Sequence, residues 1–286
     1  MTPPVVAGIN GMPRLELTHD SGSMAHVYLS GAQLTSWIPV GWHDMLYLSR
    51  RARFAPGVPI RGGIPVIFPQ FADSGPLPRH GWLRTVEWKV SGAPSDSEDA
   101  THALLYSEDT LASRKIWPHA YRAELDVTVD ENALTVALSI FNTGADSFSF
   151  TSALHSYFSL GDVRESHVEG LRGVRYLDKT DGFTERTESV DKVGIDRMTD
   201  RIYQGVPGPV VLHDHASGAF LGIAASGFPD IVVWNPWEQG ATQIDDMPDD
   251  DYLRMICVEA ALTVTPFALA PGERWTGAQR LTVQGS

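Results

Sequence analysis

The residues that most clearly suggest chemistry lie in one glycine- and proline-rich segment, residues 60–88. It contains few acidic residues but three arginines and one histidine: Arg61, Arg79, Arg84 and His80. A planar guanidinium binds a carboxylate or phosphate through two parallel hydrogen bonds, which a lysine ammonium does not do. The segment therefore predicts a pocket for an anionic ligand. The alternative is a structural loop whose arginines cover apolar surface with their aliphatic stems.

Two residues elsewhere could transfer protons, and both lie in apolar, strand-like runs. His155 lies within the run 153–158, and Glu259 lies within the run 255–261. A lone histidine in a strand is usually a hydrogen-bonded core residue, and this is the alternative for His155. Burying a carboxylate is costly unless the group is hydrogen-bonded or protonated. Glu259 therefore lies either at an exposed sheet edge or in a site that needs it.

Several other residues are less informative by themselves. Asp200 belongs to no motif that indicates a function. Trp234 and Trp237 lie near a loop, and their rings suit stacking against a sugar ring. His213 and His215 would face the same side of a strand, but the sequence offers no further ligand cluster, and we expect no metal site. The glycine-rich phosphate motifs and GxSxG are also absent from the sequence, and we expect no cofactor.

The composition is that of an ordinary globular protein, with 43% hydrophobic and 20% charged residues among 286. The formal net charge of −13 argues against nucleic acid or an anionic membrane as a partner. The single cysteine, Cys257, allows no internal disulfide, which fits a reducing compartment. The sequence has no signal-peptide pattern, and no apolar run approaches the ~20 residues of a membrane span. We therefore expect a cytoplasmic protein.

Short alternating or β-branched runs between turn residues indicate an all-β protein. Residues 120–129 and 133–142 predict a hairpin. Further strands are expected at 15–17, 26–29, 32–37, 86–90, 103–107, within 148–160, and at 210–213, 220–224, 231–234, 255–260, 262–267 and 275–283. We expect one helical turn at 111–115, a polar turn at 91–101 and irregular chain at 182–198. Residues 235–251 predict an acidic loop, either fully irregular or with one short helix, whose acidic run at 245–251 is solvated. Many short strands without a linker predict a sandwich or barrel, and a single domain over residues 1–286.

Taken in order, four segments resemble the hexose-6-phosphate mutarotases (glucose-6-phosphate 1-epimerases) of the galactose-mutarotase-like superfamily. They are RGGIPVIFPQF at 61–71, LPRHGWLR at 77–84, ALHSYF at 153–158, and VVWNPW at 232–237 followed by CVE at 257–259. The resemblance extends from about Leu15 to Val283 and includes GAQLTSW near the start and PGERW near the end. The first two segments resemble the branch of the superfamily that acts on sugar phosphates.

The resemblance implies one large antiparallel β-sandwich whose concave face holds the sugar, with no cofactor. It also implies that His155 is the catalytic acid and Glu259 the base. Substrate binding is expected of six residues: Arg61, Arg79, His80, Arg84, Asp200 and Trp234. His80 would contact the sugar or orient a catalytic group. Arg79 departs from the pattern, because the family often has Gln there, and the extra cation either strengthens phosphate binding, shifts the preferred sugar phosphate or points to solvent.

The implied reaction opens and recloses a pyranose ring. A base removes the proton of the anomeric hydroxyl and an acid protonates the ring oxygen. Rotation about C1–C2 then exposes the other face of the aldehyde, and the two groups act in reverse. A carboxyl and an imidazole, with ordinary pKa values of ~4.3 and ~6.5, suit this exchange near neutral pH. We thus expect a monomeric isomerase that interconverts the anomers of glucose 6-phosphate and related aldohexose 6-phosphates.

Three other functions are compatible with parts of the pattern. An aldose 1-epimerase acting on free sugars would need no arginine cluster. A non-catalytic sugar-phosphate-binding protein would need no acid–base pair. A glycoside hydrolase fits less well, because the resemblance supplies one catalytic carboxylate where that chemistry usually uses two.

Overall fold

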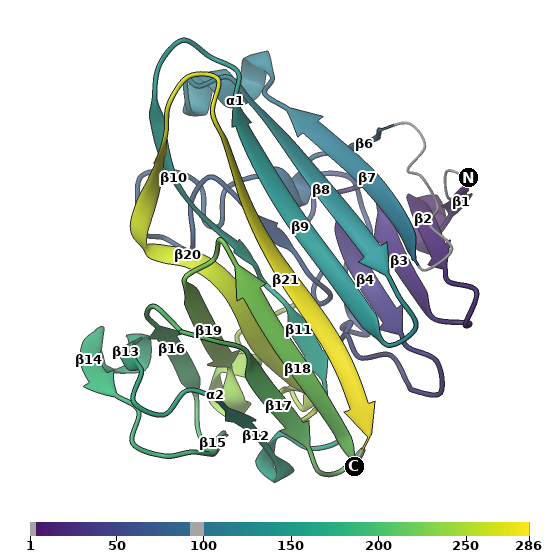
Figure 1. Ribbon diagram of the computed structural model, residues 1–286, viewed down its shortest axis with the longest axis vertical. Coiled ribbons are helices and arrows are strands. Elements are labelled where there is room, and N and C mark those ends of the chain that lie inside the picture. Colours follow the sequence, from purple (N-terminus) through teal and green to yellow (C-terminus); the bar gives the residue numbers. More distant parts are fainter. Residues whose placement is uncertain (1–3, 92–99, 286) are drawn as a thin grey trace.

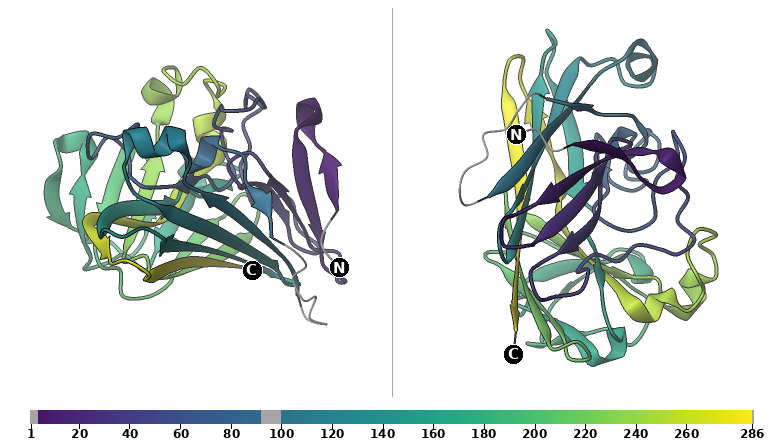
Figure 2. Two further views of the ribbon diagram at one scale, coloured as in Figure 1. Left: turned by 90° about the horizontal axis from the view of Figure 1, so that it is seen from above. Right: turned by 90° about the vertical axis from the view of Figure 1, so that its right-hand side faces the viewer.

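The computed structural model describes residues 4–91 and 100–285, in which antiparallel sheets predominate (Figure 1). An eight-stranded and a nine-stranded sheet pack against each other as a β-sandwich, with one hydrophobic core that contains residues of both. A four-stranded N-terminal sheet lies at one end of the molecule, and β13 (Arg175–Asp178) and β14 (Thr184–Thr187) lie at the opposite end (Figure 2). The predicted all-β sandwich is therefore confirmed.

The nine-stranded sheet carries the long central strands of the molecule. Its order is β15 (Val193–Gly194), β12 (Ser166–Glu169), β17 (Val210–Asp214), β18 (Ala219–Ser226), β21 (Arg274–Gly285), β9 (Ala133–Asn142), β8 (Tyr121–Val129), β7 (Thr101–Glu108) and β6 (Lys89–Val90). The predicted hairpin is β8 and β9. Their alternating residues bury one face against the core, which is why the sequence pattern was clear.

The eight-stranded sheet carries the site. From β14 and β13 it continues through β16 (Thr199–Tyr203), β19 (Asp230–Asn235), β20 (Met255–Leu269), β10 (Phe148–Leu154) and β5 (Val66–Ile67), and β11 (Tyr157–Ser159) also pairs with β20. The four-stranded sheet consists of β1 (Val5–Ala7), β2 (Pro13–Thr18), β3 (Met24–Tyr28) and β4 (Gln33–Ile38).

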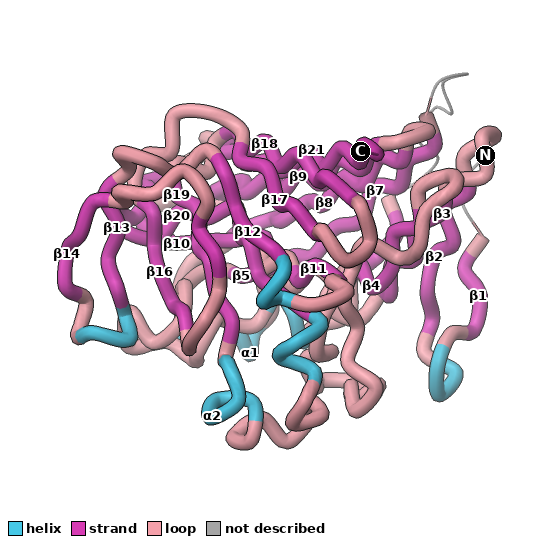
Figure 3. Tube along the Cα trace, turned by 90° about the horizontal axis from the view of Figure 1, so that it is seen from below, coloured by secondary structure: helices cyan, strands magenta, loops and turns pink. Residues whose placement is uncertain are grey.

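The helices are short. They are α1 (Leu111–Ile116), α2 (Trp237–Ala241) and the 3₁₀ turns η1 (Ile9–Gly11), η2 (Leu83–Thr85), η3 (Val163–Glu165), η4 (Lys179–Asp181) and η5 (Asp251–Arg254). In Figure 3, α2 and the long loops near it lie on the side of the strands away from β9 and β21. No helix in residues 4–91 or 100–285 is long and apolar enough to span a membrane.

The structure differs from the predicted elements in a few places. The strands expected at 255–260 and 262–267 form one strand, β20, whose pairing with β10 changes register between Phe150 and Ser152. The irregular region expected at 182–198 contains β14 and β15, and only Lys89–Val90 of the expected strand 86–90 forms one. β14 is exposed on both faces, so its sequence has no alternating pattern to detect. Residues 92–99 of the expected polar turn lie outside the described residues.

Alternation along the strands of the eight-stranded sheet separates two faces. In β20, Ile256, Val258 and Ala260 pack into the main core, whereas Cys257 and Ala261 belong to smaller clusters on the opposite face. Glu259 lies two positions from both Cys257 and Ala261, so its side chain lies on the same face as theirs, opposite the main core. The sheet thus presents one face to the core and the other to the loops that cover it, and the site residues lie on this second face.

The loop that precedes η2 is held close to the sheet by Gly81. Gly81 and His80 both have φ of 63°, in the left-handed region that side chains rarely adopt. Gly81 also bridges to Phe68, and the Trp82 amide donates to the Phe68 carbonyl at 3.1 Å. A Cβ at position 81 would lie 1.9 Å from that carbonyl oxygen, so the close approach requires glycine.

Gly81→Ala is expected to lower the free energy of unfolding by roughly 2–4 kcal/mol, because backbone strain and a clash with backbone add together. Urea unfolding measures the loss. Gly57→Ala is the matched control: Gly57 has φ of 77° but nothing lies within 4 Å of its added Cβ, so only the ~1–2 kcal/mol of left-handed strain applies. Equal losses in the two variants would mean that the approach to Phe68 contributes nothing.

Candidate active site

A pocket of about 240 Å³ opens on the loop-covered face of the eight-stranded sheet. Its floor comes from β11, β16, β19 and β20 and from His155 between β10 and β11, and its rim from the segments around residues 59–84, 179 and 244. All eight residues predicted from the sequence line it: Arg61, Arg79, His80, Arg84, His155, Asp200, Trp234 and Glu259. Trp237, the other half of the predicted tryptophan pair, instead packs on Tyr252 outside the pocket lining.

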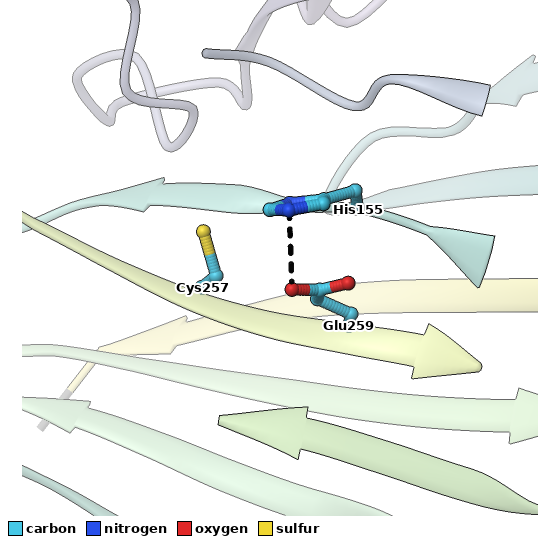
Figure 4. Close-up of side chains that lie close together, drawn as sticks. All are labelled: His155, Cys257 and Glu259. Atoms are coloured by element: carbon cyan, nitrogen blue, oxygen red, sulfur yellow. Dashed lines mark ion pairs between the residues drawn. The ribbon is translucent and has the colours of Figure 1, made fainter. Parts of the chain in front are cut away.

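Strand register brings His155 and Glu259 together. Leu154 at the end of β10 pairs with Ala260 of β20. Because the two strands are antiparallel, His155 follows beside Glu259. His155 Nε2 lies 3.4 Å from Glu259 Oε1 (Figure 4). The side chain of Glu259 is only 2% exposed and that of His155 11%, and β20 lies between β19 and β10 in the sheet. Glu259 is therefore not an edge residue, and His155 is not packed in the main core.

Burial changes the protonation of both groups. It raises the pKa of Glu259 well above its ordinary value, and the nearby Asp200 carboxylate raises it further. Burial lowers the pKa of His155 well below its ordinary value, and Arg84 and Arg61 lower it further. Both shifts favour the uncharged forms, a neutral imidazole and a protonated carboxyl, so the pair carries one proton that can pass from Glu259 to His155.

Each member of the pair also has a polar atom without a partner. Nδ1 of His155 and Oε2 of Glu259 are buried and make no hydrogen bond with any residue that the structure describes. Buried polar atoms in native proteins are nearly always hydrogen-bonded, so two orphans in one pocket require an explanation. Atoms of a bound ligand that donate and accept hydrogen bonds would satisfy both.

Aromatic rings fix the orientation of His155. Tyr157 stacks on its ring at 4.8 Å between centroids, and Trp234 and His80 contact its edges at 6.2 and 5.4 Å. Cys257 lies beside Glu259 on the same strand face, and its sulfur lies within 4.8 Å of ligand atoms of the pair (Figure 4). Burial and Glu259 raise the pKa of the Cys257 thiol, which keeps it protonated and disfavours it as a metal ligand.

Two of the three arginines already have acidic partners. Arg61 donates from Nε to Asp246 Oδ1 and from Nη1 to the Tyr157 hydroxyl, each at 3.0 Å. Burial lowers the pKa of Arg61, but Tyr157 and Asp246 outweigh it and raise the pKa. The exposed side chain of Arg79 pairs with Asp73 at 2.5 Å. Its guanidinium therefore lies at the rim of the pocket, partly in solvent.

Arg84 differs from both. It makes no ion pair within residues 4–91 and 100–285; its Nη2 donates to the Arg79 carbonyl at 3.1 Å, and its buried Nε has no partner. Burial lowers the pKa of Arg84, and the charges of Arg61 and Arg79 lower it further, although a guanidinium stays protonated in proteins. Arg84 thus offers the pocket a positive charge that no carboxylate of the described residues neutralises.

Asp200 lies at the other side of the pocket, in register with Trp234. Its Oδ2 accepts from Lys179 Nζ at 2.7 Å, and both side chains are less than 20% exposed. Burial raises the pKa of Asp200, whereas Lys179 lowers it. Three residues at the site were not predicted from the sequence: Lys179, Tyr157 and Asp246. Of these, only Tyr157 could have been predicted, because a residue two positions after His155 lies on the same face of a strand.

His80 is held neutral. Its Nδ1 accepts from the Ala72 amide at 3.3 Å, which leaves the ring proton on Nε2. Burial lowers the pKa of His80 far below its ordinary value, and His155 and Arg84 lower it further. The backbone of His80 adopts the strained left-handed conformation described above, and such strain is common at functional sites.

The depressed pKa of His80 predicts a stability change with pH. The unfolded chain binds a proton at His80 below pH ~6.5 and the folded chain does not, so the free energy of unfolding falls as the pH is lowered. His80→Asn should reduce this slope by up to about 1.4 kcal/mol per pH unit between pH 6 and 5. Urea unfolding of both proteins at several pH values measures it, and identical slopes would contradict a buried neutral His80.

The sequence of this chain matches the aldose 1-epimerase family over residues 13–282. The chain belongs to that family. The expected epimerase-type isomerase of carbohydrate metabolism is thereby confirmed at the level of the family, and the pocket described above is the candidate active site of an aldose 1-epimerase family member.

Two curated relatives and one solved structure each cover more than four fifths of this chain. A candidate glucose-6-phosphate 1-epimerase of Cenchrus ciliaris is 35% identical over 94% of this chain and 84% of its own length. One of Escherichia coli K12, with the same description, is 34% identical over 82% of this chain and 78% of its own length. The crystal structure of a candidate mutarotase from Salmonella typhimurium has a TM-score of 0.88 and 29% identity, covering 99% of this chain and 97% of the other.

Proposed function

We propose that this family member is a hexose-6-phosphate mutarotase that interconverts the α and β anomers of glucose 6-phosphate and related aldohexose 6-phosphates. The observation that carries the proposal is the joint lining of one pocket by the His155–Glu259 pair and by Arg84, a cation without an acidic partner among the described residues. An acid–base pair alone would serve a free sugar. The unneutralised guanidinium adds a site for an anionic substituent.

The proposed mechanism uses the shared proton of the pair. Glu259 in its carboxylate form accepts the proton of the anomeric hydroxyl, and His155 in its imidazolium form donates a proton to the ring oxygen. After rotation about C1–C2 the aldehyde recloses with the two transfers reversed. The pair then ends with the proton it began with, so each turnover needs no external acid or base. General acid–base catalysis of this kind contributes typically ~10²–10⁴-fold.

The phosphate would also prepare the acid. Burial and, after it, the charges of Arg84 and Arg61 lower the pKa of His155. A phosphate carries close to two negative charges near neutral pH and offsets those arginine charges when it binds. The pKa of His155 then rises toward its ordinary value, and transfer of the shared proton from Glu259 to His155 becomes less costly. In this way recognition of the substrate and activation of the acid would be linked.

The remaining binding residues have separate tasks in this proposal. Arg61 and Arg84 bind the phosphate, and Arg79 contributes a weaker field from the rim, because Asp73 already pairs with it. Asp200, held by Lys179, accepts hydrogen bonds from sugar hydroxyls. Trp234 offers an apolar ring face to the sugar, and His80 donates through Nε2 to a hydroxyl or orients His155. No metal or other cofactor is required for these steps.

The test is exchange between the anomers of glucose 6-phosphate, followed by NMR magnetisation transfer with and without the protein. Acceleration of this exchange above the spontaneous rate, with a smaller effect on glucose, is the expected result. Faster exchange of glucose than of glucose 6-phosphate would assign the protein to free sugars. Binding of glucose 6-phosphate without acceleration would instead identify a non-catalytic sugar-phosphate-binding protein.

Three further features belong to the proposal. A phosphorylated hexose is charged and is retained inside cells, so we place the enzyme in the cytoplasm. One chain forms the whole pocket, and we propose a monomer in which residues 1–286 make up a single domain. Analytical ultracentrifugation of the intact chain measures the state of association.

A further inference from the structure

A second group of metal-ligating side chains lies on the nine-stranded sheet. His167 and Glu169 belong to β12 and His213 to β17, and the register of these strands pairs His167 with His213. Val168 and Leu212 of the same strands point into the main core. Since successive side chains of a strand point to opposite faces, the three polar residues lie on the outer face of this sheet, apart from the residues that line the pocket.

The three side chains converge on one point. Glu169 Oε1 lies 3.1 Å from His167 Nε2, and Glu169 Oε2 lies 3.3 Å from His213 Nε2. One ligand atom from each residue lies within 4.8 Å of the other two. Ligand bonds of ~2.0–2.1 Å in a tetrahedral zinc site place neighbouring ligand atoms roughly 3.3 Å apart. The nitrogen–oxygen separations therefore already have the size that a bound metal ion requires.

One ring nitrogen of the group lacks a hydrogen bond. His213 Nε2 is shielded from solvent and has no hydrogen-bond partner in residues 4–91 and 100–285, although it lies close to the Glu169 carboxylate. The His213 ring is fixed between His167, which stacks on it at 4.5 Å, and Phe220, which packs against it at 4.7 Å. A metal ion shared with Glu169 would satisfy this nitrogen without any movement of the ring.

We propose that His167, Glu169 and His213 bind a divalent transition-metal ion of the Zn²⁺ type and that it links β12 to β17. Two imidazoles and one carboxylate are ligands that zinc prefers over the all-oxygen sets of magnesium and calcium. His215, in the exposed turn after β17, lies nearby, with its ring centre 5.1 Å from that of His167, but it is not one of the three residues whose ligand atoms converge. The sequence suggested no such site, since two of the ligands come from a distant strand.

Lys192 is the natural competitor of the metal. Its Nζ lies 3.8 Å from Glu169 Oε1, and its side chain is 65% exposed. An exposed ammonium can move into solvent when a metal binds, so Lys192 weakens the site without blocking it. Its removal should tighten metal binding by roughly two- to fivefold, the range of an exposed ion pair.

The experiment is calorimetric titration of the intact chain with zinc chloride, alongside thermal unfolding with and without zinc. We expect one bound ion per chain and a higher Tm with zinc. His213→Ala and Glu169→Gln should each weaken binding by at least the ~10–100-fold that loss of a residue supporting a metal ligand costs, and should abolish the rise in Tm. Lys192→Met should tighten binding, and His43→Ala, which removes an exposed histidine elsewhere, should leave it unchanged.

A further variant distinguishes this site from the pocket, where His155, Cys257 and Glu259 also lie close together. His155→Asn should bind zinc like the wild-type chain. Zinc binding that is lost in His155→Asn but kept in His213→Ala would locate the ion in the pocket and overturn the proposal. Failure of the wild-type chain to bind zinc would overturn it as well. None of these readouts depends on turnover, so they stand apart from the proposed enzymatic function.

Discussion

Glu259→Gln is expected to lower kcat for anomer exchange of glucose 6-phosphate by roughly 10²–10⁴-fold while the protein stays folded. The amide has nearly the size of the carboxyl but cannot accept the proton of the anomeric hydroxyl. KM should change little, because Arg61 and Arg84 bind the phosphate independently of this strand. NMR exchange measurements over a range of substrate concentrations separate the two constants. His155→Asn should cause a loss of similar size through the acid.

Stability measurements distinguish this chemical loss from damage to the fold. Burial raises the pKa of Glu259, so the contribution of this carboxyl to wild-type stability is largest below pH ~4.3, where the unfolded carboxyl is also protonated, and it falls as the pH rises toward the folded pKa. The amide that replaces the carboxyl has no such proton to lose, so the variant should equal or exceed the wild type in Tm at pH 8. An inactive variant with a much lower Tm would leave the role of the base unsupported.

A matched control is Glu188→Gln, which changes another buried carboxylate outside the pocket lining. Glu188 accepts from the Tyr203 hydroxyl at 2.8 Å and lies 3.4 Å from Arg201. Its replacement should lower stability, because a buried charge loses its partner, but should leave kcat near the wild-type value. Turnover by Glu259→Gln at the level of Glu188→Gln would rule out Glu259 as the base.

Arg84→Ala is expected to raise KM for glucose 6-phosphate by roughly 10–100-fold, which corresponds to the loss of ~1.5–3 kcal/mol of hydrogen bonding to a charged group. kcat should fall less, since binding of the phosphate can be equal in the ground and transition states. The weak exchange expected for glucose should not change, because that sugar has no phosphate. The ratio of the two substrates in NMR exchange is therefore the sensitive measurement.

Substitution of the other two arginines should change KM to different extents. Arg61→Ala should also raise KM, but it leaves the mostly buried Asp246 without its cation, so it should be paired with Arg61→Ala/Asp246→Asn to separate binding from stability. Arg79→Ala should have the smallest effect, because its guanidinium is 62% exposed and already pairs with Asp73. If kcat collapses for Arg61→Ala and Arg84→Ala while KM is unchanged, these residues act on the chemistry and do not anchor the phosphate.

The sequence predicted the elements whose residues are buried on one face. β8 and β9 match their expected bounds closely, because alternate residues of both strands pack into the core. β14 and β15 escaped detection, since short strands near a sheet edge need no such pattern. β20 was divided into two, because its end beyond Leu262 is exposed while its beginning is buried on both faces.

The residues predicted for the site line one pocket, but the ion pairs that hold the arginines were not predicted. The eight residues expected from the sequence line one pocket, and residue types with a resemblance to known motifs were sufficient for that. The acidic run 245–251 was interpreted as a solvated loop, whereas Asp246 and its neighbours pair with Arg61 and with the basic segment at 50–53. Such ion pairs depend on how two segments that are distant in the sequence lie in the fold, and the sequence of either segment alone does not show its partner.

The sheet holds His155 and Glu259, whereas the arginines lie outside its strands, and this has a consequence for how substrate selectivity can change. Glu259 lies in β20 and His155 directly follows β10, its neighbour in the hydrogen-bonded sheet, whereas Arg61 and Arg79 lie on loops and Arg84 lies in the 3₁₀ turn η2. Insertions and substitutions in loops cost little stability compared with changes in central strands. If His155 and Glu259 are the acid–base pair that we propose, exchange of the loops can direct the same pair to another sugar, so that selectivity changes while the pair itself is kept.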